Sequence, residues 1–267
     1  MDIANPTEEH RMLREMVRDF VTEHVEPQAL ECDRNEIFNL ELLKSLGELG
    51  LLGLTASEDY GGVGLDAIAT VIVHEELSAS DPGFALSYLA HAMLFVNNLE
   101  HIGSEEQRAR ILPKACSGEW IGAMAMSEPD VGTDVLGLST TAEIRDDGNW
   151  VINGRKMWIT NGSLADVALV WARDEEGIVR GFLLEKGMDG FTSSDIHGKL
   201  SLRSSVTSEL SMENVRVNDT SRLPNIEGLK GPLSCLTQAR YGIAWGMVGA
   251  AVDCYNTSFR KTVSFYN

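Results

Sequence analysis

Apolar residues recur at three- and four-residue intervals through roughly the first 120 residues, which is the spacing of one face of an α-helix. The pattern predicts a first helix that starts at Thr7, whose side chain can cap it, and ends at Pro27. Further helices are predicted over residues 40–49, 65–80, 90–103 and 104–115. In the last of these, Ser104 and Gln107 have capping-box spacing. We therefore expect an N-terminal bundle of about five helices.

The pattern changes near Trp120. From there on, short segments rich in β-branched and aromatic residues are separated by Gly, Asn and Asp, which is typical of antiparallel strands. Asn153-Gly154 has the composition of a two-residue type I′ turn, which predicts a hairpin that pairs NWVI with RKMWIT. In the second arm, Trp158 and Thr160 alternate with their neighbours, so we expect the indole and the hydroxyl on the same side of the strand.

Helical spacing returns after Pro232 and continues towards Asn267, with apolar residues on much of the helix surface. A lone helix of ~25 residues has no partner of its own in this segment, so we expect it to dock on another part. The predicted fold class is α+β: a helical bundle, an antiparallel β-barrel or sandwich, and the first helix of an incomplete C-terminal helical domain. The predicted domain boundaries are 1–121, 122–228 and 229–267.

The composition is that of a folded protein that does not bind nucleic acid. Of 267 residues, 43% are hydrophobic and 23% are charged, as in ordinary globular chains. Acidic residues outnumber basic ones 40 to 22, and the net charge of −18 opposes contact with a phosphate backbone. We expect no nucleic-acid partner, and any anionic ligand must be held by local donors.

Nothing in the sequence predicts export or a membrane span. No run of ~18 apolar residues exists. The opening MDIANPTEEHRMLREM has neither an apolar export core nor an Arg/Ser-rich transit pattern. The four cysteines, Cys32, Cys116, Cys235 and Cys254, are far apart and share no metal-ligand spacing. We expect reduced thiols in a cytoplasmic protein.

Common catalytic patterns are missing. None of the six histidines pairs with another ligand residue at metal-binding spacing, and His74 is expected on a helix surface. No serine lies in a Gly-x-Ser-x-Gly elbow. The glycines between Asp59 and Asp66 follow a helix-like stretch rather than a strand, so we interpret them as a turn and not as a phosphate loop. We expect neither a metal centre nor a covalent hydrolase.

Two stretches carry candidate chemistry. MSEPDVGTD, from Met126 to Asp134, presents the hydroxyls of Ser127 and Thr133 on a Pro/Gly loop. It is either a plain connection or a loop that directs hydroxyls and backbone N–H groups at an acceptor-rich heteroaromatic edge. Trp158 either packs across strands or lies flat against a cofactor. Composition alone leaves both alternatives open.

Taken together, MSEPDVGTD and INGRKMWITNG closely resemble the paired flavin-binding signature of the acyl-CoA dehydrogenase family. The order of helical, β- and helical segments agrees with that family. The stretch from Ser87 to Pro129 resembles isovaleryl-CoA dehydrogenases. RGFLLEKGM, GKLSLRSSVTSELSMENVRV and LTQARYGIAWG resemble glutaryl-CoA dehydrogenases. The likeness extends over residues 5–257.

The resemblance implies an FAD-dependent oxidoreductase that introduces an α,β double bond into a short or branched acyl-CoA thioester. It also implies an electron-transfer flavoprotein as acceptor and a homo-oligomer in full-length relatives. The implied flavin contacts are Met124, Met126, Ser127, Trp158, Ile159 and Thr160. Thr133 matches a position that touches the thioester, and Thr237 and Arg240 match the helix that lines the pantetheine and nucleotide end. A guanidinium there would help to hold an anionic CoA.

The sequence departs from the family at the catalytic base. Dehydrogenation needs a carboxylate that removes the α-proton while hydride leaves for the flavin. Some members carry it before the Arg of LTQAR, where this chain has Ala239, and others carry it in a Tyr-Glu-Gly-like stretch far toward the C-terminus that this chain does not reach. The ending SFRKTVSFYN also departs from the family pattern. We therefore expect a truncated, impaired chain and assign no catalytic residue.

Specificity and role stay open at this point. The Arg expected near the substrate carboxylate of glutaryl-CoA dehydrogenases is replaced by Ala85. One alternative to an enzyme is a non-catalytic interaction module whose orphan helix docks on a partner that completes the bundle. Another is a helical and β-stranded adaptor unrelated to flavins.

Overall fold

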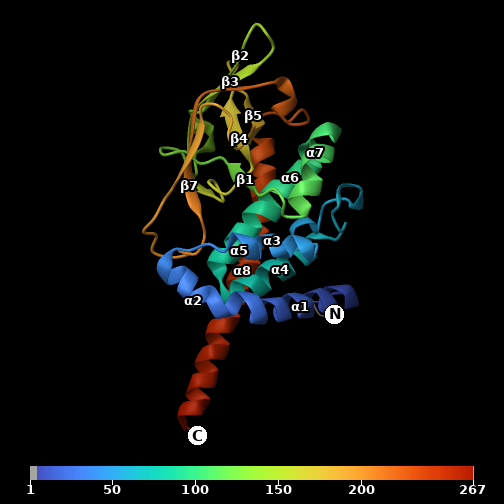
Figure 1. The fold of residues 1–267 in the computed structure, drawn as a ribbon, viewed down its shortest axis with the longest axis vertical. Coiled ribbons are helices and arrows are strands. Elements are labelled where there is room, and N and C mark those ends of the chain that lie inside the picture. Colours follow the sequence, from blue (N-terminus) through green and yellow to red (C-terminus); the bar gives the residue numbers. More distant parts are fainter. Residues whose placement is uncertain (1–4, 267) are drawn as a thin grey trace.

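The computed structural model describes residues 5–266, in which a helical part, a β-part and one long helix follow each other along the chain (Figure 1). The α-helices of the first part are α1 (Glu8–Phe20), α2 (Glu26–Asn35), α3 (Leu40–Glu48), α4 (Ala67–Ser80), α5 (Pro82–Tyr88), α6 (Asn97–Ile102) and α7 (Glu105–Cys116). The π-helical segments η1 (Val21–Val25) and η4 (Leu89–Val96) join α1 to α2 and α5 to α6. Short 3₁₀ turns are η2 (Leu51–Gly53) and η3 (Glu58–Tyr60). Within residues 5–266, no helix is both long and apolar enough to cross a lipid bilayer.

Local sequence signals account for most helix ends. Thr7 caps α1 as predicted, because its Oγ1 accepts a hydrogen bond from the His10 N–H at 3.2 Å. The prediction that Pro27 ends this helix is wrong. The helical backbone continues through the π-helical segment η1 into α2, and Pro27 lies in the first turn of α2, so the helix changes type just before the proline and does not end there. The capping box of α7 is confirmed, with the Ser104 N–H donating to Gln107 Oε1 at 2.9 Å.

The β-part is a curled sheet of seven strands in residues 122–217. The strands are β1 (Gly122–Ala125), β2 (Thr141–Ile144), β3 (Trp150–Thr160), β4 (Val167–Arg173), β5 (Val179–Glu185), β6 (Phe191–Asp195) and β7 (Thr207–Val217). Their order is β1-β4-β2-β3-β7-β6, and β5 pairs with β4. The predicted succession of helical bundle, sheet and helix is confirmed, but the sheet is mixed rather than antiparallel. Both β1 and β2 pair with β4 in parallel, because the intervening chain makes a long crossover.

The hairpin predicted at Asn153-Gly154 is wrong. β3 continues through both residues and pairs with β2 and with β7. Gly154 has a φ of 149°, and a Cβ there would lie 2.5 Å from Thr140 Oγ1, so this glycine permits a close approach in a bulged strand. The reversal between β2 and β3 lies instead at Gly148, which has a φ of 79° and donates its N–H to the Arg145 oxygen at 2.8 Å.

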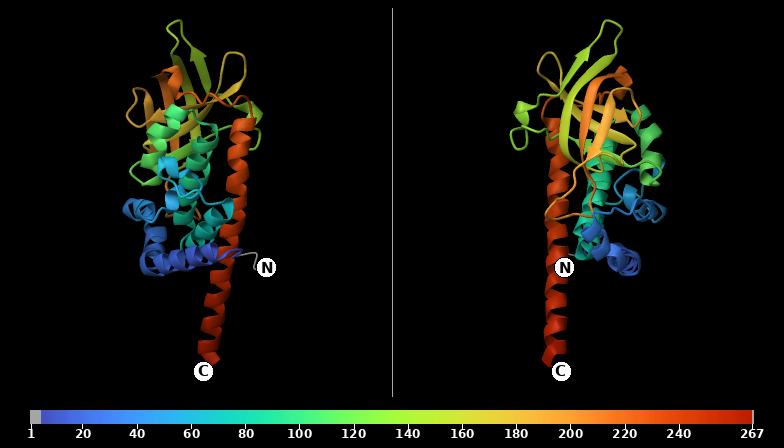
Figure 2. Two further views of the ribbon diagram at one scale, coloured as in Figure 1. Left: turned by 90° about the vertical axis from the view of Figure 1, so that its right-hand side faces the viewer. Right: turned by 60° about the vertical axis from the view of Figure 1, so that its left-hand side comes forward.

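The helix α8 (Lys230–Tyr266) runs along both parts, and its C-terminal turns project past α1 (Figure 2). Its first half packs on α4 and η4 through glycines. A Cβ on Gly242 would lie 2.7 Å from Met93 Sδ, and one on Gly246 would lie 2.3 Å from the His74 ring. His74 is only 1% exposed, so its predicted place on a helix surface is wrong: α8 covers it. From residue 251 to residue 263 the side chains of α8 are exposed.

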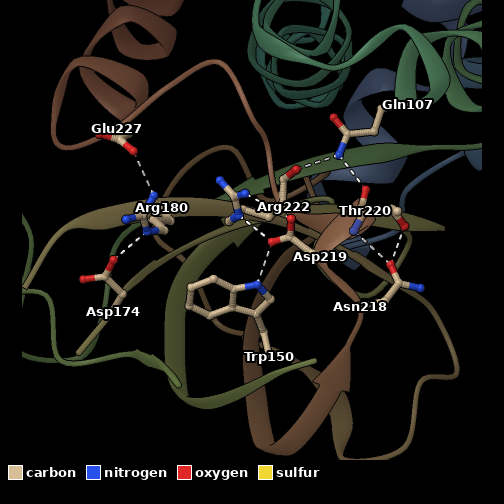
Figure 3. A network of polar contacts seen from close by, with 9 residues as sticks. All are labelled: Gln107, Trp150, Asp174, Arg180, Asn218, Asp219, Thr220, Arg222 and Glu227. Carbon is tan, nitrogen blue, oxygen red and sulfur yellow. Dashed lines mark hydrogen bonds and ion pairs between the residues drawn. The ribbon is translucent and has the colours of Figure 1, made fainter. Parts of the chain in front are cut away.

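A polar network fixes the β-part against α7 (Figure 3). Gln107 donates from Nε2 to the backbone oxygens of Thr220 and Arg222, at 2.8 and 2.9 Å. These oxygens belong to the segment around the 3₁₀ turn η6 (Asp219–Ser221), where Asp219 accepts the Trp150 Nε1–H at 2.9 Å. The side chain that caps α7 therefore also holds the sheet, and the helical and β-parts meet at a fixed junction.

Candidate functional site

The two motif segments meet at one cavity of about 180 Å³. β1 leads into the loop of residues 126–134, and the end of β3 lies beside it. On the helical side the cavity is bounded by Ala90 and Leu94 of η4 and Leu236 of α8. The six residues assigned to the flavin by resemblance all line it: Met124, Met126, Ser127, Trp158, Ile159 and Thr160. Segments about 30 residues apart in the chain thus form one wall.

A bulge in β3 directs three consecutive residues at this cavity. The register of β3 against β7 shifts between Lys156 and Ile159, and Trp158 has a φ of 64°. This left-handed conformation costs a residue with a Cβ about 1–3 kcal/mol and persists only where the surroundings impose it. Trp158 and Thr160 both line the cavity, in agreement with their predicted place on one side of the strand, but the predicted alternation is not strict, because Ile159 lines the cavity too. The indole is 56% exposed, so cross-strand packing does not account for it.

A buried ion pair links the two motif segments. Lys156 Nζ lies 2.8 Å from Glu128 Oε1 and 3.2 Å from the Met126 oxygen, and the side chains of the pair are 0% and 1% exposed. Glu128 also accepts hydrogen bonds from the backbone N–H and the hydroxyl of both Ser139 and Thr140, at 2.6 to 3.0 Å. Every polar group of this junction is therefore matched, as buried charges require.

The ion pair perturbs the titration of both partners. Burial works to raise the pKa of Glu128, but the charge of Lys156 and the donors from Lys156, Ser139 and Thr140 outweigh it and lower this pKa to about 2. Burial lowers the pKa of Lys156 to about 8, against the attraction of Glu128. Glu128 is therefore ionised at neutral pH, and Lys156 carries its balancing charge.

A backbone hydrogen bond adds to this link. The Met157 N–H donates to the Ser127 oxygen at 2.9 Å, which holds the loop beside β3. The hydroxyls of Ser127 and Thr160 form no side-chain hydrogen bond with any other described residue. Both hydroxyls are thus available to a ligand in the cavity.

His91 of η4 aligns the helical wall with the first strand. Its ring is fully buried, donates from Nε2 to the Ala115 oxygen at 3.0 Å and accepts at Nδ1 from the Gly122 N–H at 2.9 Å. Burial lowers the pKa of His91 to about 4, although the Ala115 oxygen favours the protonated ring. The imidazole is therefore neutral and keeps one tautomer, and it fixes η4 to the start of β1.

Sequence reasoning assigned no role to Glu128, Lys156 or His91. A lysine within an apolar strand is a usable signal for a buried partner, but its partner comes from a different segment. No sequence signal distinguishes His91 from the other histidines, because its two partners are backbone groups of residues 24 and 31 positions away.

The residues assigned to the substrate lie outside the lining of this cavity. Thr133 is exposed and follows the lining residue Gly132. Thr237 and Arg240 are exposed on α8, and the Thr237 hydroxyl donates to the Leu233 oxygen at 3.1 Å. Arg240 has no ion-pair partner among residues 5–266, so its guanidinium is available to an anion. The structure leaves these three assignments as predictions.

Among the described residues that line the cavity, none is an aspartate or a glutamate. Ala239, which the sequence resemblance matches to one of the family's positions for the base, is buried in the core between α8 and the helical part, with 8% of its surface exposed. A methyl group at this place can neither accept nor donate a proton.

Comparisons with known proteins show the family of the chain. Residues 7–119 match the family model of the acyl-CoA dehydrogenase N-terminal domain, and residues 123–215 match that of the middle domain. The chain is 32% identical to butyryl-CoA dehydrogenase from Megasphaera elsdenii, with a TM-score of 0.90 over 95% of this chain and 68% of that one. This chain belongs to the acyl-CoA dehydrogenase family.

Two other acyl-CoA dehydrogenases are more similar in sequence to this chain than the butyryl-CoA dehydrogenase is. The chain is 43% identical to isovaleryl-CoA dehydrogenase, mitochondrial, from Pongo abelii, over 91% of this chain and 59% of the relative. It is 42% identical to a glutaryl-CoA dehydrogenase from Mycobacterium smegmatis solved in complex with FADH2, with a TM-score of 0.91 over 95% of this chain and 65% of that one. The chain thus spans less than two thirds of the length of both relatives.

Proposed function

We propose that the cavity holds the edge of the isoalloxazine ring of FAD and that this chain provides the flavin wall of a dehydrogenase for a short or branched acyl-CoA. The observation that carries the proposal is the convergence of two unbonded hydroxyls and an exposed indole on one cavity. When bound, FAD supplies the hydride acceptor of α,β-dehydrogenation.

The lining fits the edge of a flat heteroaromatic ring. Ser127 and Thr160 offer hydroxyls to ring nitrogens and oxygens, Trp158 offers an aromatic face, and Met124 and Met126 offer polarisable apolar contact. The volume of about 180 Å³ lies below the ~300–1,000 Å³ of complete small-molecule sites, so the rest of FAD has to lie on the open surface or against another polypeptide.

Substrate binding would place the thioester near Thr133 and the CoA phosphates near Arg240 on α8. A guanidinium without an ion-pair partner in the described chain suits an anion on a protein of net charge −18. We expect impaired turnover, because no lining residue carries the carboxylate that must take the α-proton. An electron-transfer flavoprotein as acceptor and a homo-oligomeric assembly rest on the family resemblance.

The direct test is a titration of the purified chain with FAD, followed by anaerobic addition of isovaleryl-CoA, butyryl-CoA or glutaryl-CoA. We expect saturable quenching of flavin fluorescence and little or no bleaching at 450 nm on the timescale of turnover. Absence of FAD binding would refute the assignment of the cavity. Rapid bleaching would refute the account of the missing base. A cytoplasmic location stays a prediction, since the relative from Pongo abelii is named mitochondrial.

The second candidate function is an interaction module, and the surface of α8 favours it. Exposed apolar side chains follow one face of α8 from its packed first half into its projecting C-terminal turns and form what we call the α8 apolar stripe: Tyr241, Val248, Val252, Tyr255 and Phe259. Their spacing of three, four and seven residues is that of a helix-packing seam. The occupant we propose is a helical polypeptide that supplies a C-terminal helical domain, as the family resemblance implies. This chain spans 59% and 65% of the length of the two relatives, which leaves room for such a domain in them.

This candidate is tested by mixing the chain with the separately produced C-terminal helical domain of an isovaleryl-CoA dehydrogenase. We expect a one-to-one complex by light scattering, and its loss in the Tyr255→Asp/Phe259→Asp double variant. Thr257→Asp, on the opposite side of the same exposed turn, is the matched control and should leave the complex intact. Self-association of the chain without the added domain, or no complex at all, would contradict the proposed occupant.

A further inference from the structure

One charged pair joins both halves of the flavin wall from inside the protein. Glu128 directly follows the lining residues Met126 and Ser127 in the chain. Lys156 lies two positions before the lining residue Trp158. Neither charged side chain lines the cavity, and both are buried behind it. The pair therefore contacts the supports of the site and not its occupant.

We propose that Glu128 and Lys156 are positioning residues of the flavin site, whose ion pair sets the separation between the 126–134 loop and the bulged end of β3. The proposal rests on the proposed function of the cavity. Through this link the Ser127 hydroxyl, the Trp158 indole and the Thr160 hydroxyl are held in one geometry before any ligand binds.

The chemistry of the pair suits positioning better than stabilisation. Apolar contacts at the same place would bury surface without fixing a direction, whereas charge-assisted hydrogen bonds fix both distance and angle. The carboxylate of Glu128 is held by four donors from Ser139 and Thr140, and its remaining partner is Lys156. Lys156 in turn donates to the Met126 oxygen at 3.2 Å, so the position of one lining residue depends directly on the pair.

The pair also has an electrostatic consequence for the cavity. It is neutral as a whole, but without Lys156 the four other donors would keep Glu128 ionised, and an uncompensated negative charge would stand behind Met126. Negative charge near a flavin disfavours the added electrons, so the midpoint potential of bound FAD should fall. Neutralising Glu128 as well should reverse that fall.

The experiment compares the wild-type chain with Lys156→Met, with the double variant Lys156→Met/Glu128→Gln, and with Lys44→Met. Lys44 pairs with Glu41 on the surface of α3, so its substitution removes the same charge without touching the cavity. Three quantities are measured: exchange of the Met157 amide in the protein without ligand, the dissociation constant of FAD, and the midpoint potential of the bound flavin.

For Lys156→Met we expect faster exchange of the Met157 amide, FAD binding weaker by more than ~10-fold, and a lowered midpoint potential. In the double variant the potential should return toward the wild-type value, although more native contacts have been removed. A purely structural role would instead make the double variant worse in every quantity. Lys44→Met should match the wild type in all three.

Wild-type exchange and wild-type FAD affinity in folded Lys156→Met would overturn the inference. If Lys156→Met does not fold, the milder Ser139→Ala, which removes one donor to Glu128, should weaken FAD binding by a smaller factor, and no change there would count equally against it. If the wild type itself does not bind FAD, the proposed function fails, and the positioning role of the pair is judged on Met157 exchange alone.

Discussion

Residue 239 is an alanine, and the sequence resemblance matches this position to the one where some acyl-CoA dehydrogenases carry their catalytic base. Ala239 is almost fully buried on the face of α8 that packs on the helical part. A carboxylate in such surroundings has a raised pKa, because burial disfavours the charged form, and a raised pKa brings it toward the range useful for proton abstraction at neutral pH. The methyl group at this position is one reason for the impaired turnover that we propose.

The first prediction restores that group. Ala239→Glu should increase the rate of flavin bleaching by isovaleryl-CoA by about 10²–10⁴-fold, the usual contribution of a positioned general base. Stopped-flow absorbance at 450 nm measures it. Ala244→Glu adds the same carboxylate at an exposed place on α8 and should leave the rate unchanged. Equal rates in both variants would show that position 239 does not reach the substrate.

At the scale of elements, the close contact of α8 with α4 depends on glycine. A Cβ on Gly246 would lie 2.3 Å from atoms of the His74 ring, and one on Gly249 would lie 2.1 Å from the Glu75 oxygen. Alanine normally favours a helix over glycine by about 1 kcal/mol, but here the steric clash is the larger effect. The seam is therefore a packing requirement and not a flexible point.

The second prediction follows from this seam. Gly246→Ala should lower the free energy of unfolding by about 1–3 kcal/mol, since α8 has to move away from α4. Urea unfolding monitored by circular dichroism measures it. Gly137→Ala is the control, because a Cβ there would meet no atom closer than 3.4 Å. If Gly246→Ala were as stable as the control, the helices would not be in the close contact described.

At the scale of the whole molecule, buried titratable groups make stability depend on pH. Burial lowers the pKa of both His74 and His91 from 6.5 to about 4. Between these values the unfolded chain binds more protons than the folded one, so the stability present above pH 6.5 is lost as the pH falls toward 4. Glu128, whose pKa is lowered from 4.5 to about 2, adds a further loss below pH 4.5.

The third prediction is a slope of stability against pH. Between pH 6.5 and 4 each of these histidines should contribute up to about 1.4 kcal/mol per pH unit to the fall in unfolding free energy. Denaturant titrations at several pH values measure it. His91→Gln should be less stable at pH 7. Its unfolding free energy should also fall less steeply with pH, because the contribution of one buried histidine is missing. An unchanged slope in His91→Gln would refute the assignment.

The sequence predicts correctly those features of the fold that depend on residues close together in the chain. The cap at Thr7, the capping box of Ser104 and Gln107 and the order of helical, β- and helical segments depend on neighbours within a few positions. The wrong predictions concern long-range packing. Asn153-Gly154 has turn composition, yet β3 stays extended because β2 and β7 pair with it on both sides. His74 has the sequence surroundings of a surface residue, yet α8 buries it.

The sequence by itself determined the helical periodicity, the strand-forming segments and, through two short motifs, the family of the protein, because those signals are carried by adjacent residues. Only the tertiary structure decided that β1 and β4 run parallel, that a bulge turns Trp158, Ile159 and Thr160 toward one cavity, and that Glu128 and Lys156 form a pair. Each of these depends on contacts between segments far apart in the chain. Side-chain chemistry can be read along a sequence, but the distance between two side chains is fixed only when the chain folds.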